Sequence, residues 1–217
     1  HIFTATLSAA ALPYLDDHRV GDAAIVPAAT WLDLALAAAR SLGRAGPLAL
    51  RDLSFHAALV LPPAGAEIQL ALLAEPDGAL SFTGHGRAAE SWSHHVSGRI
   101  TSAPDLEDMS ARTCPEDQPL TPVPADSFYA ALARRGLRYG PRCRGVVGLR
   151  TAGGRVVAEL APPAGSAAPG AVLQPVLLDA ALHAVDTDHG GVDAYLQCEL
   201  GLSPVALRQL ATLYLQR

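Results

Sequence analysis

Residues 17–27 read Asp-His-Arg-Val-Gly-Asp-Ala-Ala-Ile-Val-Pro, and residues 28–37 continue as Ala-Ala-Thr-Trp-Leu-Asp-Leu-Ala-Leu-Ala. His18 thus stands ahead of a short apolar segment that Pro27 closes. Proline is well placed just before a helix, because it forfeits no intrahelical hydrogen bond there. Alanine and leucine then favour a helix from about Ala28 to Ser41. Since few polar residues interrupt it, we expect protein to surround this helix on most sides, which requires a sheet around it.

A second proline-led apolar segment lies at residues 174–185 and reads Gln-Pro-Val-Leu-Leu-Asp-Ala-Ala-Leu-His-Ala-Val. Asp179 and His183 are four residues apart in it, so on a helix they share one face. The chain therefore offers two apolar helices, each with an ionisable residue at or near its start. Packed together, they could direct His18 and Asp179 at one substrate.

The remaining pattern is typical of antiparallel strands with turn residues between them. The segment 101–124, rich in Pro, Ser, Thr and acids, predicts a linker. A helix from about Ser127 to Arg135 follows, with Asp126 as its N-cap. These features together predict an α+β protein. The strands are expected at 2–7, 49–55, 67–73, 80–86 and 91–100 before the linker, and at 144–150 and 155–160 after it.

Composition argues against several classes of protein. The net charge of −5 disfavours nucleic acid as a partner. All 16 basic residues are arginine. The sequence contains no run of 18 apolar residues, so it predicts no membrane span. Cys114, Cys143 and Cys198 lack the spacing of a metal site and indicate a reducing cytoplasm. The adjacent His94 and His95 would point to opposite faces of a strand, so we expect no metal there.

The chain resembles the dehydratase domain of a modular type I polyketide synthase. That family has three motifs that occur here in the same order, and a Trp-x-x-His-x-x-Gly pattern in a strand of its first half. The matching residues are His18 to Pro27, Tyr139-Gly140-Pro141 and Asp179 to His183 for the motifs, and Trp92, His95 and Gly98 for the strand pattern.

The resemblance implies a double hot-dog fold, in which two antiparallel sheets each wrap around a buried helix. Residues 1–100 would form the N-terminal half, 101–124 the linker and 125–217 the C-terminal half. Only 38 residues follow Asp179 (217 minus 179), whereas the first half devotes about 60 residues to strands after its helix. We therefore expect the C-terminal half to be incomplete. The Leu-Pro element that the family has after its second helix appears only as Leu202-Ser203-Pro204.

The resemblance also implies a hydro-lyase reaction of polyketide and antibiotic biosynthesis. A 3-hydroxyacyl chain, held on the phosphopantetheine arm of an acyl carrier protein, would lose water to give the 2-enoyl thioester. His18 would be the base, because the pKa of histidine lies near working pH. Asp179 would be the acid, kept protonated by its apolar flanks. No metal or cofactor is expected in the domain.

Five further residues have roles by resemblance. Tyr139 would form a hydrogen bond in the site, His183 would orient Asp179, and Gly140 and Pro141 would lie beside the substrate. A backbone N–H near Gly21 would face the thioester oxygen. Two positions depart from the family pattern, because Asp22 replaces a usual glycine and Gln174 a frequent histidine. Asp22 could repel negative charge on that oxygen, and Gln174 could alter the tunnel wall.

Alternatives to this function remain. The same fold and residues could close a ring by adding a hydroxyl across the new double bond, or could shift that bond. An inactive domain could serve as a docking or spacer unit, with His18 a structural hydrogen-bonding residue. The expected partners are the carrier protein, neighbouring domains of a megasynthase and a second copy of the domain as a homodimer.

Overall fold

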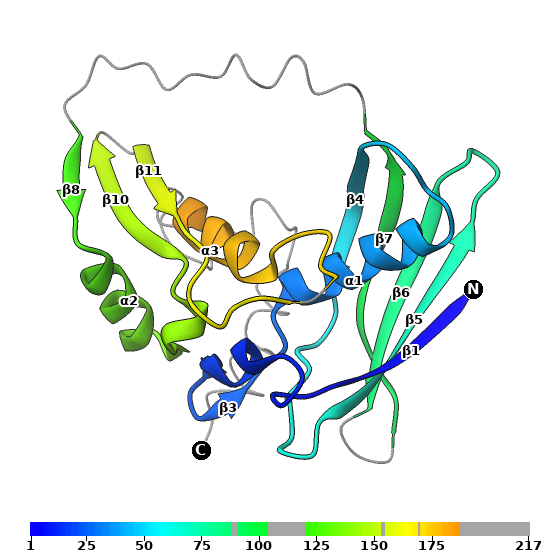
Figure 1. Ribbon diagram of the computed structural model, residues 1–217, viewed down its shortest axis with the longest axis horizontal. Coiled ribbons are helices and arrows are strands. Elements are labelled where there is room, and N and C mark those ends of the chain that lie inside the picture. The colour runs from blue at the N-terminus through cyan, green and yellow to red at the C-terminus, as the bar shows by residue number, and fades with distance from the viewer. Residues whose placement is uncertain (88–90, 104–119, 153–154, 169, 187–217) are drawn as a thin grey trace.

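The computed structural model describes residues 1–87, 91–103, 120–152, 155–168 and 170–186. Two sheets and three helices dominate these residues (Figure 1). The predicted strands and helices that fall on described residues are all present. The region after residue 186, including Leu202-Ser203-Pro204, lies outside the described residues, as do residues 104–119 of the expected linker.

The first sheet has the strand order β1-β5-β6-β7-β4, with every neighbouring pair antiparallel. Along β5 and β6 buried and less buried residues alternate, because successive side chains of a strand point to opposite faces. The buried face packs against the first helix, α1. The bounds are β1 Ile2–Leu7, β4 Leu48–Phe55, β5 Ala66–Ala74, β6 Leu80–Arg87 and β7 Ser93–Ser102.

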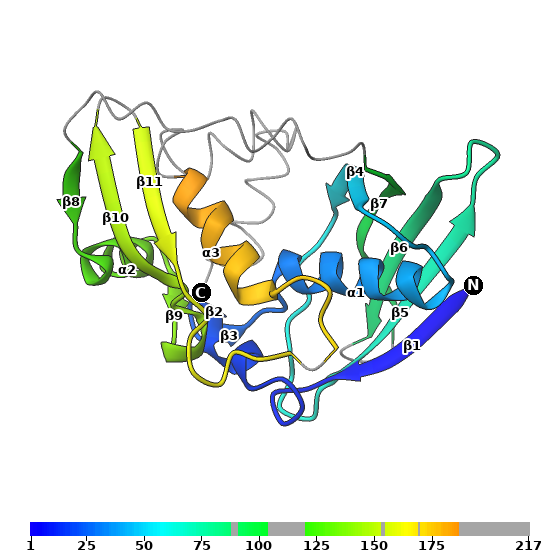
Figure 2. The same cartoon turned by 45° about the horizontal axis from the view of Figure 1, so that its top comes forward.

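Helix α1 spans Ala28–Ser41, as predicted, and nine of its residues are buried. It lies against the curved sheet in both ribbon views (Figures 1 and 2). Trp31 approaches the sheet closely at Gly84, where a Cβ atom would lie 2.8 Å from the indole Cε3. A glycine is therefore needed there for the helix to pack at this distance. The helix surrounded by sheet that the sequence predicts is thus present.

The second sheet has the order β11-β10-β8 and packs against the third helix, α3 Pro175–Asp186. Helices α1 and α3 also contact each other, so the two layered units share one interior. The strands are β8 Thr121–Val123, β10 Val146–Ala152 and β11 Arg155–Leu160. Strands β7 and β8 reach into the two ends of the segment 101–124, which the sequence predicts to be a linker.

A third, small sheet joins the two parts of the chain. Strands β2 His18–Val20 and β3 Ala23–Ala24 form a hairpin. Strand β9 Leu137–Tyr139 pairs with β2, although the paired residues are at least 117 positions apart in the sequence. Sequence analysis did not predict β9. Short 3-10 turns precede β2 and follow β9, at η1 Pro13–Asp17 and η3 Pro141–Cys143. Strand β2 of this sheet begins with His18, one of the predicted site residues.

Helix α2 spans Ala125–Arg134, which starts two residues earlier than predicted. Pro124 stands at its N-cap, so the expected N-cap Asp126 lies instead in the first turn. There its carboxylate pairs with Arg144 at 3.5 Å. Among the described residues no helix is both long enough and apolar enough to cross a membrane.

Candidate active site

His18 is fixed at the first position of β2 with one ring nitrogen already used. It is 8% exposed, and its Nδ1 lies 2.8 Å from the carbonyl oxygen of Ile25. A carbonyl can only accept, so Nδ1 carries the hydrogen. In the neutral ring the lone pair is therefore on Nε2, which points into the protein interior. The hairpin thus selects the tautomer that a base requires.

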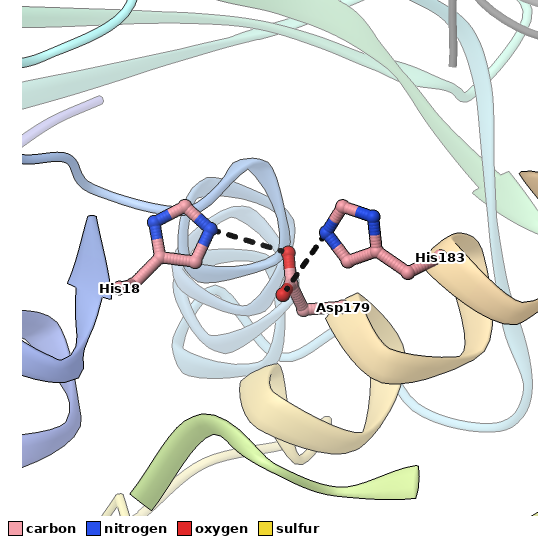
Figure 3. A group of neighbouring side chains, drawn as sticks. All are labelled: His18, Asp179 and His183. Carbon is pink, nitrogen blue, oxygen red and sulfur yellow. Dashed lines mark ion pairs between the residues drawn. The ribbon is translucent and has the colours of Figure 1, made fainter. Parts of the chain in front are cut away.

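Asp179 lies opposite His18, on the second turn of α3, and is also 8% exposed. Its Oδ1 is 3.7 Å from Nε2 of His18, and its Oδ2 is 3.5 Å from Nε2 of His183. Figure 3 shows the carboxylate between the two imidazoles. The structure therefore brings together the two ionisable residues that the sequence placed near the starts of two separate helices.

Tyr139 completes the group from β9. His18 and Tyr139 are register partners in the antiparallel β2–β9 pair, so their side chains lie on the same face. The phenol oxygen is 2.5 Å from Nε2 of His183 and 3.5 Å from Nε2 of His18. Burial holds the pKa of Tyr139 well above its ordinary value of 10.0, so the hydroxyl keeps its proton and can donate. The phenol thus bridges the two histidines.

The segment after Tyr139 is held against Asp17 by Gly140 and Arg142, with Pro141 between them at the start of η3. The N–H of Gly140 donates to the carbonyl oxygen of Asp17 at 2.8 Å, and the Asp17 carboxylate accepts from the N–H of Arg142 at 2.7 Å. A Cβ atom on residue 140 would lie 2.4 Å from Cγ of Asp17, so only glycine fits. The Tyr-Gly-Pro motif therefore packs the turn after Tyr139 against Asp17, the residue before His18.

The charges of the pair are coupled. Burial lowers the pKa of His18 and His183 lowers it further, while the Asp179 carboxylate opposes the shift, so that the pKa lies below 6.5. Burial raises the pKa of Asp179, as the apolar flanks predicted, but the two imidazoles outweigh burial and the net shift is downward from 3.8. The prediction that apolar flanks alone keep Asp179 protonated is therefore wrong. The proton of the acid depends on its histidine neighbours.

Three predicted details of the site differ in the structure. The N–H of Gly21 already donates to the carbonyl oxygen of Gly136 at 2.8 Å, so it does not face a substrate in this arrangement. The side chain of Asp22 is 96% exposed and pairs with Arg138 at 2.7 Å, so its charge points away from the His18–Asp179 pair. Gln174 is exposed at the start of α3, where its carbonyl accepts from Leu178, and its side chain forms no interior wall.

Among the described residues, His18, Asp179 and His183 form a group whose nitrogen and oxygen atoms could bind a cation. Ligand atoms of His18, Asp179 and His183 all lie within 4.8 Å of one another. His94 and His95 point to opposite faces of β7, as predicted, because His94 stacks on His56 and His95 on Trp31. A separate surface pocket of about 380 Å³ lies beside β9, and neither His18 nor Asp179 lines it.

Sequence analysis did not single out two carboxylates that accept backbone hydrogen bonds close to the elements of the site. Asp17 docks the turn after Tyr139, and Asp33 on α1 accepts two backbone hydrogen bonds from the segment before α3. Asp33 could have been noticed as the one acidic residue within a helix that is otherwise almost wholly apolar. Asp17 carries no such signal, because its partners are distant in the sequence.

Comparisons with known proteins identify the family. A family model described as "Polyketide synthase dehydratase domain" matches residues 1–87, and one described as "Polyketide synthase dehydratase N-terminal domain" matches residues 107–195. The dehydratase domain from the terminal module of the rifamycin polyketide synthase is 33% identical, with a TM-score of 0.71 over 86% of this chain and 70% of that chain. The chain belongs to the polyketide synthase dehydratase family. The crystal structure of the erythromycin dehydratase is 30% identical, with a TM-score of 0.69 and coverage of 85% and 69%. The predicted double hot-dog fold is confirmed by these members of the dehydratase family.

Curated relatives of this dehydratase-family chain are much longer proteins. A spectinabilin polyketide synthase system protein from Streptomyces orinoci is 34% identical over 196 residues, which are 86% of this chain and 5% of that protein. The mycoketide-CoA synthase of Mycobacterium tuberculosis is 34% identical over 192 residues, or 85% of this chain and 4% of that protein. The chain therefore spans about one-twentieth of the length of these relatives.

Proposed function

We propose that this domain removes water from a 3-hydroxyacyl thioester to give the 2-enoyl thioester. The observation that carries the proposal is the 3.7 Å separation of His18 Nε2 and Asp179 Oδ1, both buried. A dehydration needs one group that takes a proton and one that gives a proton, on neighbouring carbons of the same chain. This pair supplies both from one side of the substrate.

His18 is the base and Asp179 the acid. Nε2 of His18 takes the proton from the carbon next to the thioester carbonyl, and the electrons of that C–H bond form the new double bond. Asp179 acts in its protonated form, in which it holds the one proton that the coupled group of His18, Asp179 and His183 shares. The C–O bond of the 3-hydroxyl breaks, and the oxygen receives that proton and leaves as water. Each positioned proton-transfer group contributes about 10²–10⁴-fold to the rate.

The geometry also provides a way to restore the starting state. After the reaction His18 carries the proton and Asp179 is ionised, so the pair still holds one proton in total. Transfer across the 3.7 Å gap, directly or through the released water, returns the proton to Asp179. His183 and Tyr139 steady the carboxylate and the imidazole during this exchange, at 3.5 Å and 3.5 Å respectively.

The substrate proposed is an acyl chain on the phosphopantetheine arm of an acyl carrier protein. This chain matches only 5% of the spectinabilin polyketide synthase system protein and 4% of the mycoketide-CoA synthase, which supports neighbouring domains of a megasynthase as its partners. The homodimer, the division into halves at 1–100 and 125–217, and the absence of a cofactor or metal in the reaction stay predictions. The proposed chemistry uses only side chains of the domain.

The test is turnover of a 3-hydroxyacyl chain loaded on a carrier protein, followed by mass spectrometry of the acyl chain. The domain should release one water, and His18→Ala and Asp179→Asn should each lower the rate by about 10²–10⁴-fold while remaining folded. Arg99→Gln, on the outer side of β7, serves as the control and should keep the wild-type rate. Unchanged turnover in both active-site variants would refute the assignment. A cyclic product, or a shifted double bond made from an enoyl substrate, would instead favour the ring-closing or isomerising alternatives.

A further inference from the structure

One carboxylate ties the helix of the first half to the helix that carries Asp179. Oδ1 of Asp33 accepts hydrogen bonds from the backbone N–H groups of Val172 and Leu173, both at 2.7 Å. Asp33 lies in the middle of α1 and is 7% exposed. Its two partners precede the first residue of α3 by only three and two positions, so they fix where that helix begins.

A carboxylate buried at position 33 destabilises the folded state unless hydrogen bonds such as these two offset its loss of hydration. An acidic side chain on a buried helix loses its hydration, and that loss must be offset by hydrogen bonds. Burial accordingly raises the pKa of Asp33, and the two N–H donors oppose the rise. Both donors come from the other part of the chain, 139 and 140 residues away. The contact therefore couples the two parts of the chain directly, at a partly buried position.

We propose that Asp33 is a positioning residue for the dehydration. Its two hydrogen bonds hold the start of α3 against α1, and thereby set the distance between Asp179 on α3 and His18 on β2. This inference rests on the proposed function, because the distance matters only if those two side chains share the proton transfers. Asp33 itself does not touch the reacting atoms.

The expected consequence is a loss of rate rather than of substrate affinity. A misplacement of about 1 Å in a catalytic group can cost on the order of 100-fold in rate. When Asp33→Ala removes the acceptor, the segment 172–173 is released and Asp179 moves relative to His18. We expect kcat to fall about 10- to 100-fold with KM changed less than about threefold. Asp33→Asn keeps an acceptor oxygen in the same place and should recover most of the loss.

The matched control is Thr30→Val on the same helix. Thr30 is 2% exposed, and its hydroxyl bonds to that of Tyr14 at 3.2 Å, a contact that stays within the first half. This variant should lose stability without losing kcat. If Asp33→Ala and Thr30→Val have equal kcat values, Asp33 is only structural and the inference is overturned. Should Asp33→Ala not fold, Asp33→Ser, which leaves a shorter acceptor, replaces it with the same expected direction.

Hydrogen exchange gives a second readout, on the wild-type protein. The amides of Val172 and Leu173 should exchange slowly, together with those of the first turn of α3. Fast exchange of both amides in the folded protein would contradict the inference whatever the variants do. The proposed function fails separately, if His18→Ala and Asp179→Asn keep full activity. Loss of activity in those two variants with no effect at Asp33 would reject this inference alone.

Discussion

His18 on β2 stands directly opposite Tyr139 on β9, so the strand pairing itself brings the phenol to the His18 imidazole. The two rings meet edge to face with centroids 5.2 Å apart. Tyr139 makes the same kind of contact with His183, also at 5.2 Å. One tyrosine therefore organises both histidines around Asp179.

Removing the phenol oxygen should slow the reaction without unfolding the protein. Tyr139→Phe loses the hydroxyl between the imidazoles, and we expect kcat to fall about 10-fold, the value of one hydrogen bond of about 1.4 kcal/mol. Tyr129→Phe is the control, because its hydroxyl accepts from the N–H of Val146 instead. That variant should lose about 1 kcal/mol of stability and keep kcat. Equal rates for Tyr139→Phe and wild type would show that the phenol only packs.

Adding one methyl group at Gly140 should damage both fold and site. The new Cβ would overlap the carboxylate of Asp17, so Gly140→Ala should destabilise the protein by about 1–3 kcal/mol and lower activity. Gly148→Ala is the control, because its Cβ would meet its nearest neighbour at 3.4 Å, an ordinary contact. Chemical denaturation and a turnover assay measure both effects. A stable and fully active Gly140→Ala would show that the contact between residue 140 and Asp17 does not require glycine.

The pH profile should report the charge of His18. Its pKa is lowered by burial and by the neighbouring His183, so the base stays neutral below 6.5 and kcat/KM should fall only at a lower pH. Gln can hydrogen-bond to the same partners but carries no charge. We therefore expect His183→Gln to remain active, with the acid limb of kcat/KM moved upward. An acid limb that stays in place would remove His183 as a cause of the shift.

Folding stability should decline as the pH falls from 7 to 5. Folding lowers the pKa of His18, His56 and His85. The unfolded chain therefore binds more protons at these histidines than the folded protein does, and acid stabilises the unfolded state. His94 stacks between His56 and His85, with ring centroids 4.0 and 4.8 Å away, and repels their charged forms. His94→Gln should therefore show a smaller decline between denaturation curves at pH 7 and pH 5. An identical decline would exclude the histidine stack as a contributor.

Local pattern was enough to predict α1, α3 and most strands. Helix α1 begins and ends where the sequence predicts, because its signals are local: Pro27 stands before it, the apolar run forms it, and Gly43 follows its last residue Ser41. The antiparallel alternation in β5 and β6 is equally local. The choice of His18, Asp179, Tyr139 and His183 as site residues came from the family resemblance and from residue type together.

What the sequence alone determined is therefore the set of elements and the chemical types available to the site. Only the tertiary structure decided how they work. It showed that Gly140 meets Asp17, that the N–H of Gly21 is already bonded, and that Asp33 anchors the segment before α3. It also reversed the expected pKa shift of Asp179. The physical reason is the same in each case, because hydrogen bonds and charges act over a few ångströms of space, while these partners lie up to 161 residues apart along the chain (179 minus 18).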